Sequence, residues 1–341
     1  MAASNAPRQR GAAPVSSGPT LTSQHAIDPP LAERRLCFVL GKGGVGKSTV
    51  SAALGIAYAR QGHRTLLLEV AGRDRLSRLL DRADASTEPT VVGEGLYAAT
   101  IDPEEATEEY LRGQLPVRAI ADVLAGSKTF RTFTQAAPGL KEMVTLGKIW
   151  SYAVELRPDQ EAPEWDRLVV DAPATGHAVA LLETAANVRE IAQGGPIHEQ
   201  AERIREVISH PAATGIAVVA RPDELPVSEA LDAIDRLRAA ELPVAAAILN
   251  CITPRRFSDE DVAALESARA LVNGSERGAI DAALAESRRA AREARHARDL
   301  EGGGVPVIRL PLLARGAGRL AGLEELASTV TDGLSQRAGV A

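Results

Sequence analysis

The sequence predicts an α/β protein with a mostly parallel sheet, helices on both faces of that sheet, and a helical subdomain formed by insertions. Continuous apolar runs such as RRLCFVL (34–40), RTLLLEV (64–70) and RLVVDAP (167–173) are typical of parallel strands buried on both faces. Helical patterns separate these runs, in the order of a βαβ unit. A glycine-rich loop, GKGGVGKS (41–48), joins the first run to the first helix.

The composition is that of a soluble globular protein. Of the 341 residues, 45% are hydrophobic and only 3% are aromatic, so we expect a core built mainly of Ala, Leu and Val. The net charge of −6 and the lack of a long basic run argue against nucleic acid as the main partner. No apolar run reaches the ~18 residues of a membrane span, and MAASNAPRQRGAAPVSSGPT contains no hydrophobic signal segment. We therefore expect a cytoplasmic protein without an integral membrane segment.

The elements follow one another in a regular order. Residues 1–33 are rich in Ala, Ser, Pro and Gly and are expected to form a disordered tail, while residues 34–335 are expected to form a single domain. The helix STVSAALGIAYARQG (48–62) is expected to end at Gly62. Further strands are expected at 215–220, 242–250 and 305–313.

Two segments are expected to add helices to the sheet. The first covers residues 103–155 and the second covers residues 257–300. The second segment alternates positive and negative charges at helical spacing, which predicts a solvated helix. A nucleic-acid-binding face is the alternative interpretation of that helix.

The glycine-rich loop matches G-x-x-x-x-G-K-[ST], the phosphate-binding P-loop, between a predicted strand and a predicted helix. Its glycines let backbone N–H groups surround an anion, and the following helix adds its positive N-terminal end. Lys47 is expected at the β- and γ-phosphates, and Ser48 is expected to ligate Mg²⁺. The predicted contacts to ATP are Gly41, Gly43, Gly44, Val45, Gly46, Lys47, Ser48 and Thr49. The alternative is a glycine-rich turn that binds nothing.

A second constellation lies in VVDAPATGHAVALL (169–182). Asp171 ends a predicted buried strand, where a carboxylate can hold Mg²⁺ through water. Pro173 and Gly176 shape the loop that follows. His177 begins the next helix, either as part of a nucleotide-sensing loop or simply as a helix-start residue.

These motifs resemble those of a known family. Lys42 makes the loop resemble the deviant Walker A motif of the nitrogenase iron protein, of the MinD and ParA ATPases, and of the ArsA-type ATPases. DAPATGH (171–177) resembles the switch II sequence D-T-A-P-T-G-H of the ArsA-type ATPases, with Ala172 and Ala174 in place of two family residues. The resemblance covers residues 35–330. It implies a P-loop ATPase dimer in which Lys42 reaches the partner's nucleotide and switch II senses the γ-phosphate. The alternative for Lys42 is added charge near the phosphate of its own chain.

Three further segments are similar to those of the ArsA-type family. Asn250, in AAILNCITP (246–254), matches the residue that contacts adenine, with a strand-end cap as the alternative. Pro311 and Leu312 match a late segment near the adenine. AAPGLKEMVTLGKIW (136–150) resembles a segment of bacterial members and is expected to pack near the switch loops.

The resemblance fails at switch I, where the family aspartate positions the attacking water and this chain has Ala71. Glu69 and Asp74 are nearby carboxylates that are expected either to substitute as catalytic groups or to be structural. The cargo sites differ as well. Arsenite binding needs clustered thiolates, whereas Cys37 and Cys251 are far apart and are expected to be buried core residues rather than metal ligands or a disulfide.

A groove for tail-anchored proteins would need many flexible apolar side chains, and this chain has only two methionines. The segment 184–210 is also short and polar. The leading hypothesis is therefore a Mg²⁺-dependent ATPase that forms a homodimer, or a heterodimer with a paralogue, and couples its nucleotide state to an unknown client protein. The alternatives are a nucleotide-dependent binding module that needs a paralogous subunit, and a MinD-type positioning ATPase, which the polar C-terminal segment LEELASTVTDGLSQRAGVA does not favour.

Overall fold

The computed structural model describes residues 30–71, 75–81, 86–114, 139–154, 156, 162–186, 196–314, 316–317 and 320–335. The expected tail falls almost wholly outside these residues. Its last part does not: Leu31–Glu33 forms a 3₁₀ turn, and Leu31 is buried against the sheet. Burial of the Leu31 side chain and a hydrogen bond from the Tyr58 hydroxyl to the Leu31 carbonyl at 3.1 Å hold this turn.

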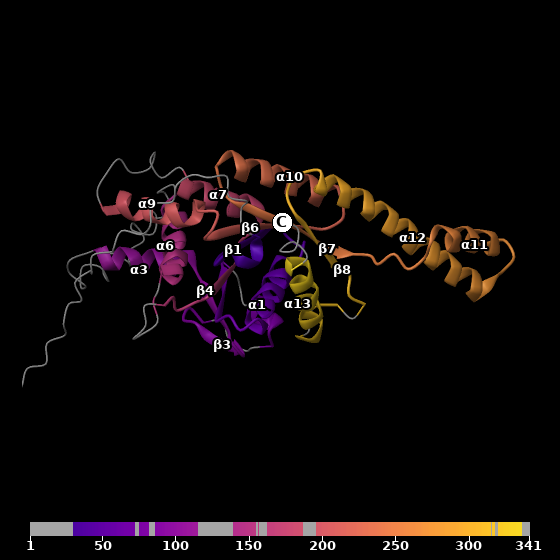
Figure 1. Ribbon diagram of the computed structural model, residues 1–341, viewed down its shortest axis with the longest axis horizontal. Coiled ribbons are helices and arrows are strands. Elements are labelled where there is room, and N and C mark those ends of the chain that lie inside the picture. The colour runs from indigo at the N-terminus through magenta and orange to yellow at the C-terminus, as the bar shows by residue number, and fades with distance from the viewer. Residues whose placement is uncertain are drawn as a thin grey trace, which may run out of the picture.

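An eight-stranded sheet forms the centre of the described part, in the order β3-β4-β2-β5-β1-β6-β7-β8 (Figure 1). Every neighbouring pair is parallel except β3 and β4, which confirms the predicted α/β class. The strands are β1 (Leu36–Gly41), β2 (Thr65–Val70), β3 (Thr90–Gly93), β4 (Leu96–Ile101), β5 (Arg167–Asp171), β6 (Thr214–Ala220), β7 (Val244–Ile252) and β8 (Val307–Pro311).

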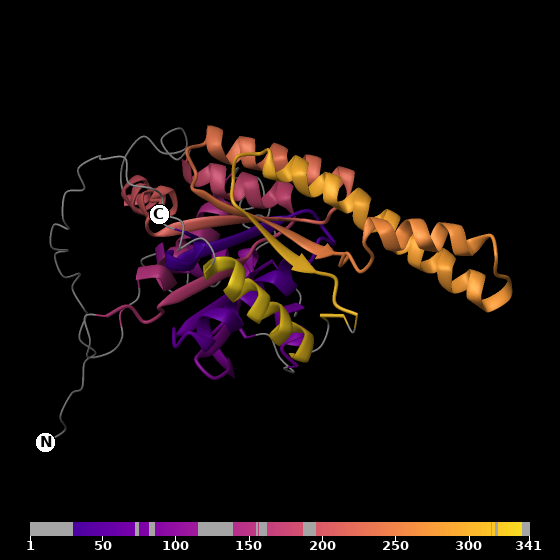
Figure 2. The same cartoon turned by 45° about the vertical axis from the view of Figure 1, so that its right-hand side comes forward.

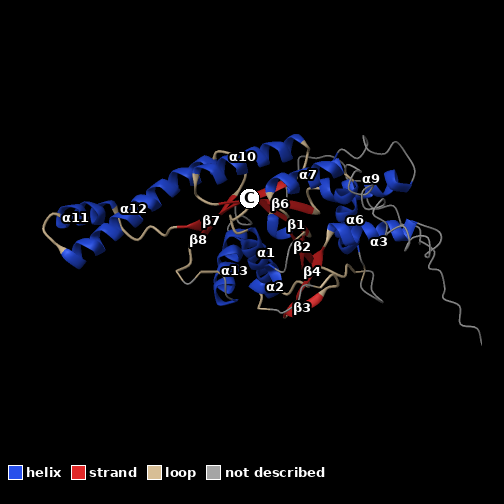
Figure 3. Cartoon of the chain, turned by 180° about the vertical axis from the view of Figure 1, so that it is seen from behind, coloured by secondary structure: helices blue, strands red, loops and turns tan. Residues whose placement is uncertain are grey.

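Both faces of the sheet are covered, as the continuous apolar runs predicted. Along β1, Leu36, Phe38 and Leu40 face one apolar core, while Cys37 and Val39 face the other. The first core is closed by α6 (Leu140–Val154), α7 (Thr175–Ala186), α9 (Pro196–Ser209) and α10 (Glu224–Ala239). The second is closed by α1 (Lys47–Arg60), α2 (Arg75–Leu79) and α13 (Leu320–Ser335), which are labelled close together in Figure 3.

Helical additions extend the molecule at two ends. At one end α3 (Pro103–Gln114) packs beside α6 and α9. At the other, α11 (Asp259–Arg269) and α12 (Gly274–Glu301) form an antiparallel hairpin that projects beyond β8 (Figure 2). Within the described residues, no helix combines the length and apolar character needed to cross a bilayer.

Candidate functional site

The P-loop connects the end of β1 to the start of α1 in the middle of the sheet. Three of its glycines have positive φ angles: 154° at Gly41, 88° at Gly44 and 94° at Gly46. A Cβ atom at Gly41 would collide with the Val219 carbonyl, and one at Gly46 would collide with the Asn250 amide. These glycines are therefore required by the backbone conformation and by close approach, as expected of a loop that wraps an anion.

Lys47 is the first residue of α1 and is buried, with only 7% of its surface exposed. Its Nζ donates a hydrogen bond to the Lys42 carbonyl at 3.2 Å, which holds the side chain across the loop. Burial lowers the pKa of Lys47, and the nearby carboxylate of Asp171 opposes that shift. The first N–H groups of a helix have no acceptor within it, so the ammonium and these N–H groups together form a site for phosphate.

Asp171 ends β5 directly opposite Glu69 of β2 and is also buried. Its carboxylate accepts hydrogen bonds from the hydroxyls of Ser48 and Ser51, the latter at 3.3 Å. Burial, with the neighbouring charge of Glu69, raises the pKa of Asp171 to about 6 against the opposing effects of Ser48 and Lys47. A hydroxyl and a carboxylate are oxygen ligands that Mg²⁺ prefers. Ser48 and Asp171, predicted from separate motifs, are thus side by side and fit a magnesium ion.

Glu69 has its carboxylate directed to the start of α2. Its two oxygens accept hydrogen bonds from the backbone N–H groups of Arg75 and Leu76, each at 3.1 Å, and the residue is 2% exposed. The observed role is a helix cap that holds α2 beside the P-loop, and the expected catalytic role stays a prediction. Ala71 has φ 53° and carries no carboxylate. Asp74, the other expected substitute, lies outside the described residues.

Lys42 forms an ion pair within its own chain. Its Nζ lies 2.6 Å from a carboxylate oxygen of Glu229 on α10, and both side chains are 37% exposed. The pair lies at the rim of the P-loop, so Lys42 is accessible from outside the subunit. Sequence reasoning did not identify Glu229, because an isolated acidic residue on a surface helix carries no local signal.

The residues predicted to contact adenine line a cavity of about 260 Å³ next to the P-loop. Asn250, at the end of β7, is buried and donates a hydrogen bond from Nδ2 to the Val45 carbonyl at 2.9 Å. Its amide thus supports the loop as well as lining the cavity. The other lining residues include Gly44, Val45, Gly46, Thr49, Cys251, Pro311 and Leu312. The structure therefore brings the predicted P-loop and base-contacting residues together.

A second cavity, of about 440 Å³, also borders the P-loop. Its lining consists of Gly44, Gly46, Lys47, Ser48 and Thr49 of the P-loop and α1, with Arg75, Arg78 and Leu79 of α2. The two arginines add positive charge where phosphates would lie. Sequence reasoning missed them, although the basic run GRDRLSRLL after the second predicted strand was the available signal.

The predicted switch residues follow Asp171 in the loop from β5 to α7. Pro173 is half-buried, whereas Gly176 and His177 are exposed in the first turn of α7. The backbone N–H of His177 donates to the Ala174 carbonyl at 2.9 Å, which closes that turn. The loop is therefore joined directly to the residue that would bind metal.

The two cysteines are free thiols on strands that are not neighbours in the sheet. Cys37 lies inside β1, where burial raises its pKa to about 12, and Cys251 lies near the end of β7, where burial also raises its pKa. No group of three or more His, Cys, Asp or Glu side chains among the described residues is arranged to hold a metal ion. The geometry offers no thiolate cluster of the kind that arsenite would need.

Comparisons with known proteins identify the family to which this chain belongs. Residues 34–194 match the family model described as anion-transporting ATPase, a range that includes the P-loop and Asp171. The chain is 36% identical over 236 residues to ATPase BagA of Mycobacterium tuberculosis, which covers 67% of this chain and 68% of that protein. It is 25% identical over 252 residues to the arsenical pump-driving ATPase of Escherichia coli, covering 67% of this chain and 41% of that protein. The chain belongs to the ArsA-type ATPase family.

Proposed function

We propose that this chain binds ATP with Mg²⁺ and hydrolyses it as a dimer in the cytoplasm, and that its nucleotide state controls the binding of a client protein. The observation that carries the proposal is the meeting of Lys47, Ser48 and Asp171 at the mouth of the P-loop. These residues come from two separate motifs, and a structural turn alone would have no need for a buried lysine beside a buried carboxylate.

Each of these residues has a definite task. Lys47 and the N–H groups at the start of α1 would bind the β- and γ-phosphates, and Arg75 and Arg78 would lie beside them. Ser48 and Asp171 would hold Mg²⁺, which neutralises charge on the phosphate oxygens. Asn250, Pro311 and Leu312 would enclose the base.

The proposed dimer gives Lys42 its role. A cation from the partner subunit stabilises transition-state charge only when the two subunits are closed together. In one chain Lys42 pairs with Glu229, and both side chains are partly exposed, so the lysine must leave this partner to act across an interface. If Lys42 exchanges the Glu229 carboxylate for a phosphate of the partner's nucleotide, closure of the dimer would depend on the presence of ATP.

We place the proposed client surface at the end of the molecule where α3, α6 and α9 meet. These helices enclose a cavity of about 480 Å³ whose lining includes Tyr110, Leu140, Met143 and Ile204. Of these helices, α6 and α9 pack against α7, which begins at the loop after Asp171. A change in the conformation of this loop would therefore alter the shape of the cavity.

The experiment compares ATP binding and Mg²⁺-dependent hydrolysis in the wild type and in Lys47→Ala. Lys141→Ala is the matched control, because it removes a lysine that pairs on the surface with Glu104 at 2.9 Å. We expect Lys47→Ala to abolish hydrolysis and weaken ATP binding at least tenfold, the effect of losing a charge-assisted contact. Equal ATP affinity in Lys47→Ala and the wild type would overturn the proposal.

A second function, a nucleotide-dependent binding module, is favoured by one observation. Glu69 uses both carboxylate oxygens to cap α2, and Ala71 offers no carboxylate to position water. A paralogous subunit would then have to supply the missing group. Single-turnover hydrolysis, measured alone and with candidate paralogues, separates the two functions: turnover that appears only in the mixture supports the module.

A further inference from the structure

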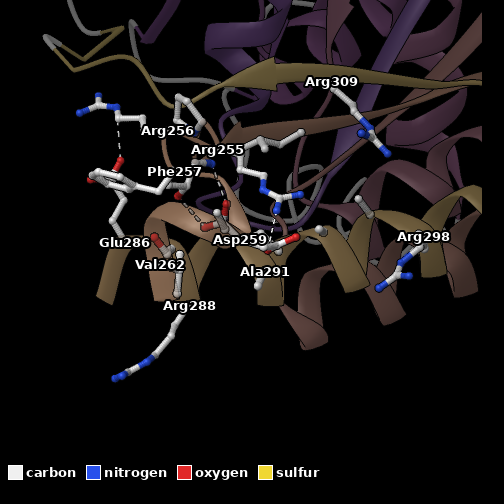
Figure 4. A pocket seen from close by; sticks show the side chains of 18 of the residues that line it. Arg255, Arg256, Phe257, Asp259, Val262, Glu286, Arg288, Ala291, Arg298 and Arg309 are labelled. Atoms are coloured by element: carbon white, nitrogen blue, oxygen red, sulfur yellow. Dashed lines mark hydrogen bonds and ion pairs between the residues drawn. The ribbon is translucent and has the colours of Figure 1, made fainter. Parts of the chain in front are cut away.

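A cavity of about 720 Å³, larger than either cavity at the P-loop, lies between the loop after β7, the helix α12 and the strand β8 (Figure 4). Neither the P-loop motif nor the switch residues contribute to it. Residues from Ile252 to Phe257 form one wall, α12 forms the floor, and α11 closes one end through Val262. Cavities of roughly 300–1,000 Å³ are typical of small-molecule sites.

The floor of this cavity is apolar because α12 places small residues there. Four alanines of α12 line the hollow: Ala290, Ala291, Ala294 and Ala297. Ala291 and Ala294 are exposed, so no other residue of the described part fills the space above them. The ring of Phe257 and the side chain of Ile252 extend the apolar surface along the wall.

The rim of the cavity carries guanidinium groups from three elements. They belong to Arg255 and Arg256 of the loop, to Arg288 and Arg298 of α12, and to Arg309 of β8, all labelled in Figure 4. Four of the five lie within ion-pair distance of a carboxylate, namely in the pairs Arg255–Asp259, Arg256–Glu286, Arg288–Glu266 and Arg309–Glu301.

Arg298 is the exception, since within the described part of the chain its side chain has no hydrogen-bond or ion-pair partner. The buried carboxylate in this region, Glu293, is already satisfied by Thr253 and by Arg289 at 2.7 Å. The charge that is left without a partner in the cavity is therefore positive.

We propose that this cavity binds a small organic anion with an apolar body. The anionic group would pair with Arg298, with Arg309 close by, and the body would cover the alanine floor. An arginine fork matches a carboxylate or sulfonate in geometry as well as in charge. A polyanion such as nucleic acid is disfavoured, because Asp259, Glu266 and Glu286 alternate with the arginines and would repel a continuous chain of phosphates.

The test uses anilinonaphthalene sulfonate as the probe and phenylnaphthylamine, its neutral counterpart, as the comparison. Binding is followed by fluorescence titration of the full chain. Ala294→Leu fills the cavity, and Ala285→Leu makes the same change at an exposed position of α12 outside it. We expect saturable binding of the sulfonate, a dissociation constant raised at least about fivefold by Ala294→Leu, and no change in Ala285→Leu.

A second pair of variants tests the charge. Arg298→Gln removes the unpaired cation, and Arg292→Gln removes an exposed arginine of the same helix that does not line the cavity. We expect Arg298→Gln to weaken sulfonate binding about threefold, the scale of a partly exposed ion pair, while Arg292→Gln leaves it unchanged. The neutral probe should bind more weakly than the sulfonate.

Three results would overturn the proposed site. They are no saturable sulfonate binding by the wild type, equal dissociation constants for the two variants of either pair, or equal affinity of the wild type for the charged and the neutral probe. The probe carries no phosphate and the titration contains no nucleotide. Failure here therefore leaves the proposed ATPase function untouched, and failure of that function leaves this site untouched.

Discussion

Asp171 and Glu69 are two buried carboxylates on adjacent parallel strands, and the only buried lysine of the described residues, Lys47, lies beside them. Burial removes the Asp171 carboxylate from water, and the adjacent charge of Glu69 adds to that cost, which is why the pKa of Asp171 is raised to about 6. Such an arrangement is retained where a ligand supplies the missing positive charge. At the scale of single residues, the site is therefore built at the expense of stability.

Asp171→Asn should stabilise the ligand-free protein at neutral pH. The pKa of Asp171 is raised from 3.8 to about 6 on folding, so the folded state favours the protonated carboxyl. The destabilisation is absent below the unfolded-state pKa and is complete once the pH exceeds the folded-state pKa. A shift of this size corresponds to at most about 3 kcal/mol in the free energy of unfolding.

Urea denaturation across a pH series checks this prediction. The variant should be more stable than the wild type near pH 8 in the absence of Mg²⁺, and its advantage should shrink as the pH falls towards 3.8. If the stability advantage of the variant grew in acid, or was absent at every pH, the Asp171 carboxylate would not be destabilising the folded protein. The variant should also lose the stabilisation that Mg²⁺ with ATP gives the wild type.

Gly46→Ala should destabilise the P-loop, because its φ is 94° and a Cβ would meet the Asn250 amide. The expected loss in the free energy of unfolding is about 1–3 kcal/mol. Gly43→Ala is the matched control, since a Cβ there has open space and its φ is not positive. The double variant Gly46→Ala/Asn250→Ala should recover part of the lost free energy of unfolding, because the amide that meets the new Cβ is gone. Equal thermal midpoints for the Gly43 and Gly46 variants would refute the steric argument.

Residue-scale features were predictable where they depend on local spacing. Gly41, Lys47 and Ser48 lie within one short motif, so their joint role could be inferred from the sequence. Contacts between distant residues could not: Lys42 and Glu229 are 187 positions apart, and Asn250 and Val45 are 205 apart. Only the parallel sheet brings such pairs to one edge, and a sequence read alone does not give its strand order.

Among the elements, α2 is the one whose position most directly affects the site. It is only five residues long, and a helix this short is not stable by itself. Glu69 fixes it by accepting two backbone N–H groups, and Leu76 and Leu80 anchor it in the core. The cap thereby places Arg75 and Arg78 at the phosphate side of the P-loop.

Glu69→Ala should therefore destabilise the protein by about 2 kcal/mol, because two buried N–H groups lose their acceptor. Glu69→Gln keeps one acceptor oxygen and should lose less. If the carboxylate is a cap rather than a catalyst, single-turnover hydrolysis by Glu69→Gln should stay within about threefold of the wild type. A loss of roughly a hundredfold or more with unchanged stability would instead identify Glu69 as the catalytic carboxylate.

The sequence predicted the buried strands and the edge strand β8, and missed β3 and β4 at the other edge of the sheet. The strands β1, β2 and β5 could be predicted because both of their faces are largely apolar. β3 and β4 gave a weaker signal, since β3 is short, partly exposed and antiparallel to β4. The available indication of this hairpin in the sequence was Gly95, which forms the turn with a φ of 66°.

At the scale of the whole molecule, the helical additions lie at opposite ends and the P-loop lies between them (Figure 1). The predicted helical segments 103–155 and 257–300 correspond to α3 with α6 and to α11 with α12, although residues 115–138 lie outside the described part. Their position beyond the sheet could not be derived from the sequence, because charge alternation identifies a solvated helix without saying where it projects.

Subunit mixing tests whether ATP is hydrolysed in a dimer with Lys42 acting across the interface. Steady-state Mg²⁺-dependent ATP hydrolysis is measured for the wild type, for Lys42→Ala, for Lys47→Ala and for an equimolar mixture of the two variants. In a mixed dimer, the Lys47→Ala subunit still supplies Lys42 to the intact P-loop of its partner.

Each variant alone should be inactive, and the mixture should recover about a quarter of the wild-type rate, because half of the dimers regain one of two sites. Full activity in Lys42→Ala, or no recovery in a mixture shown to exchange subunits, would contradict the trans role of Lys42. Absence of turnover in the wild type, with ATP still bound, would contradict the ATPase itself and favour the binding module.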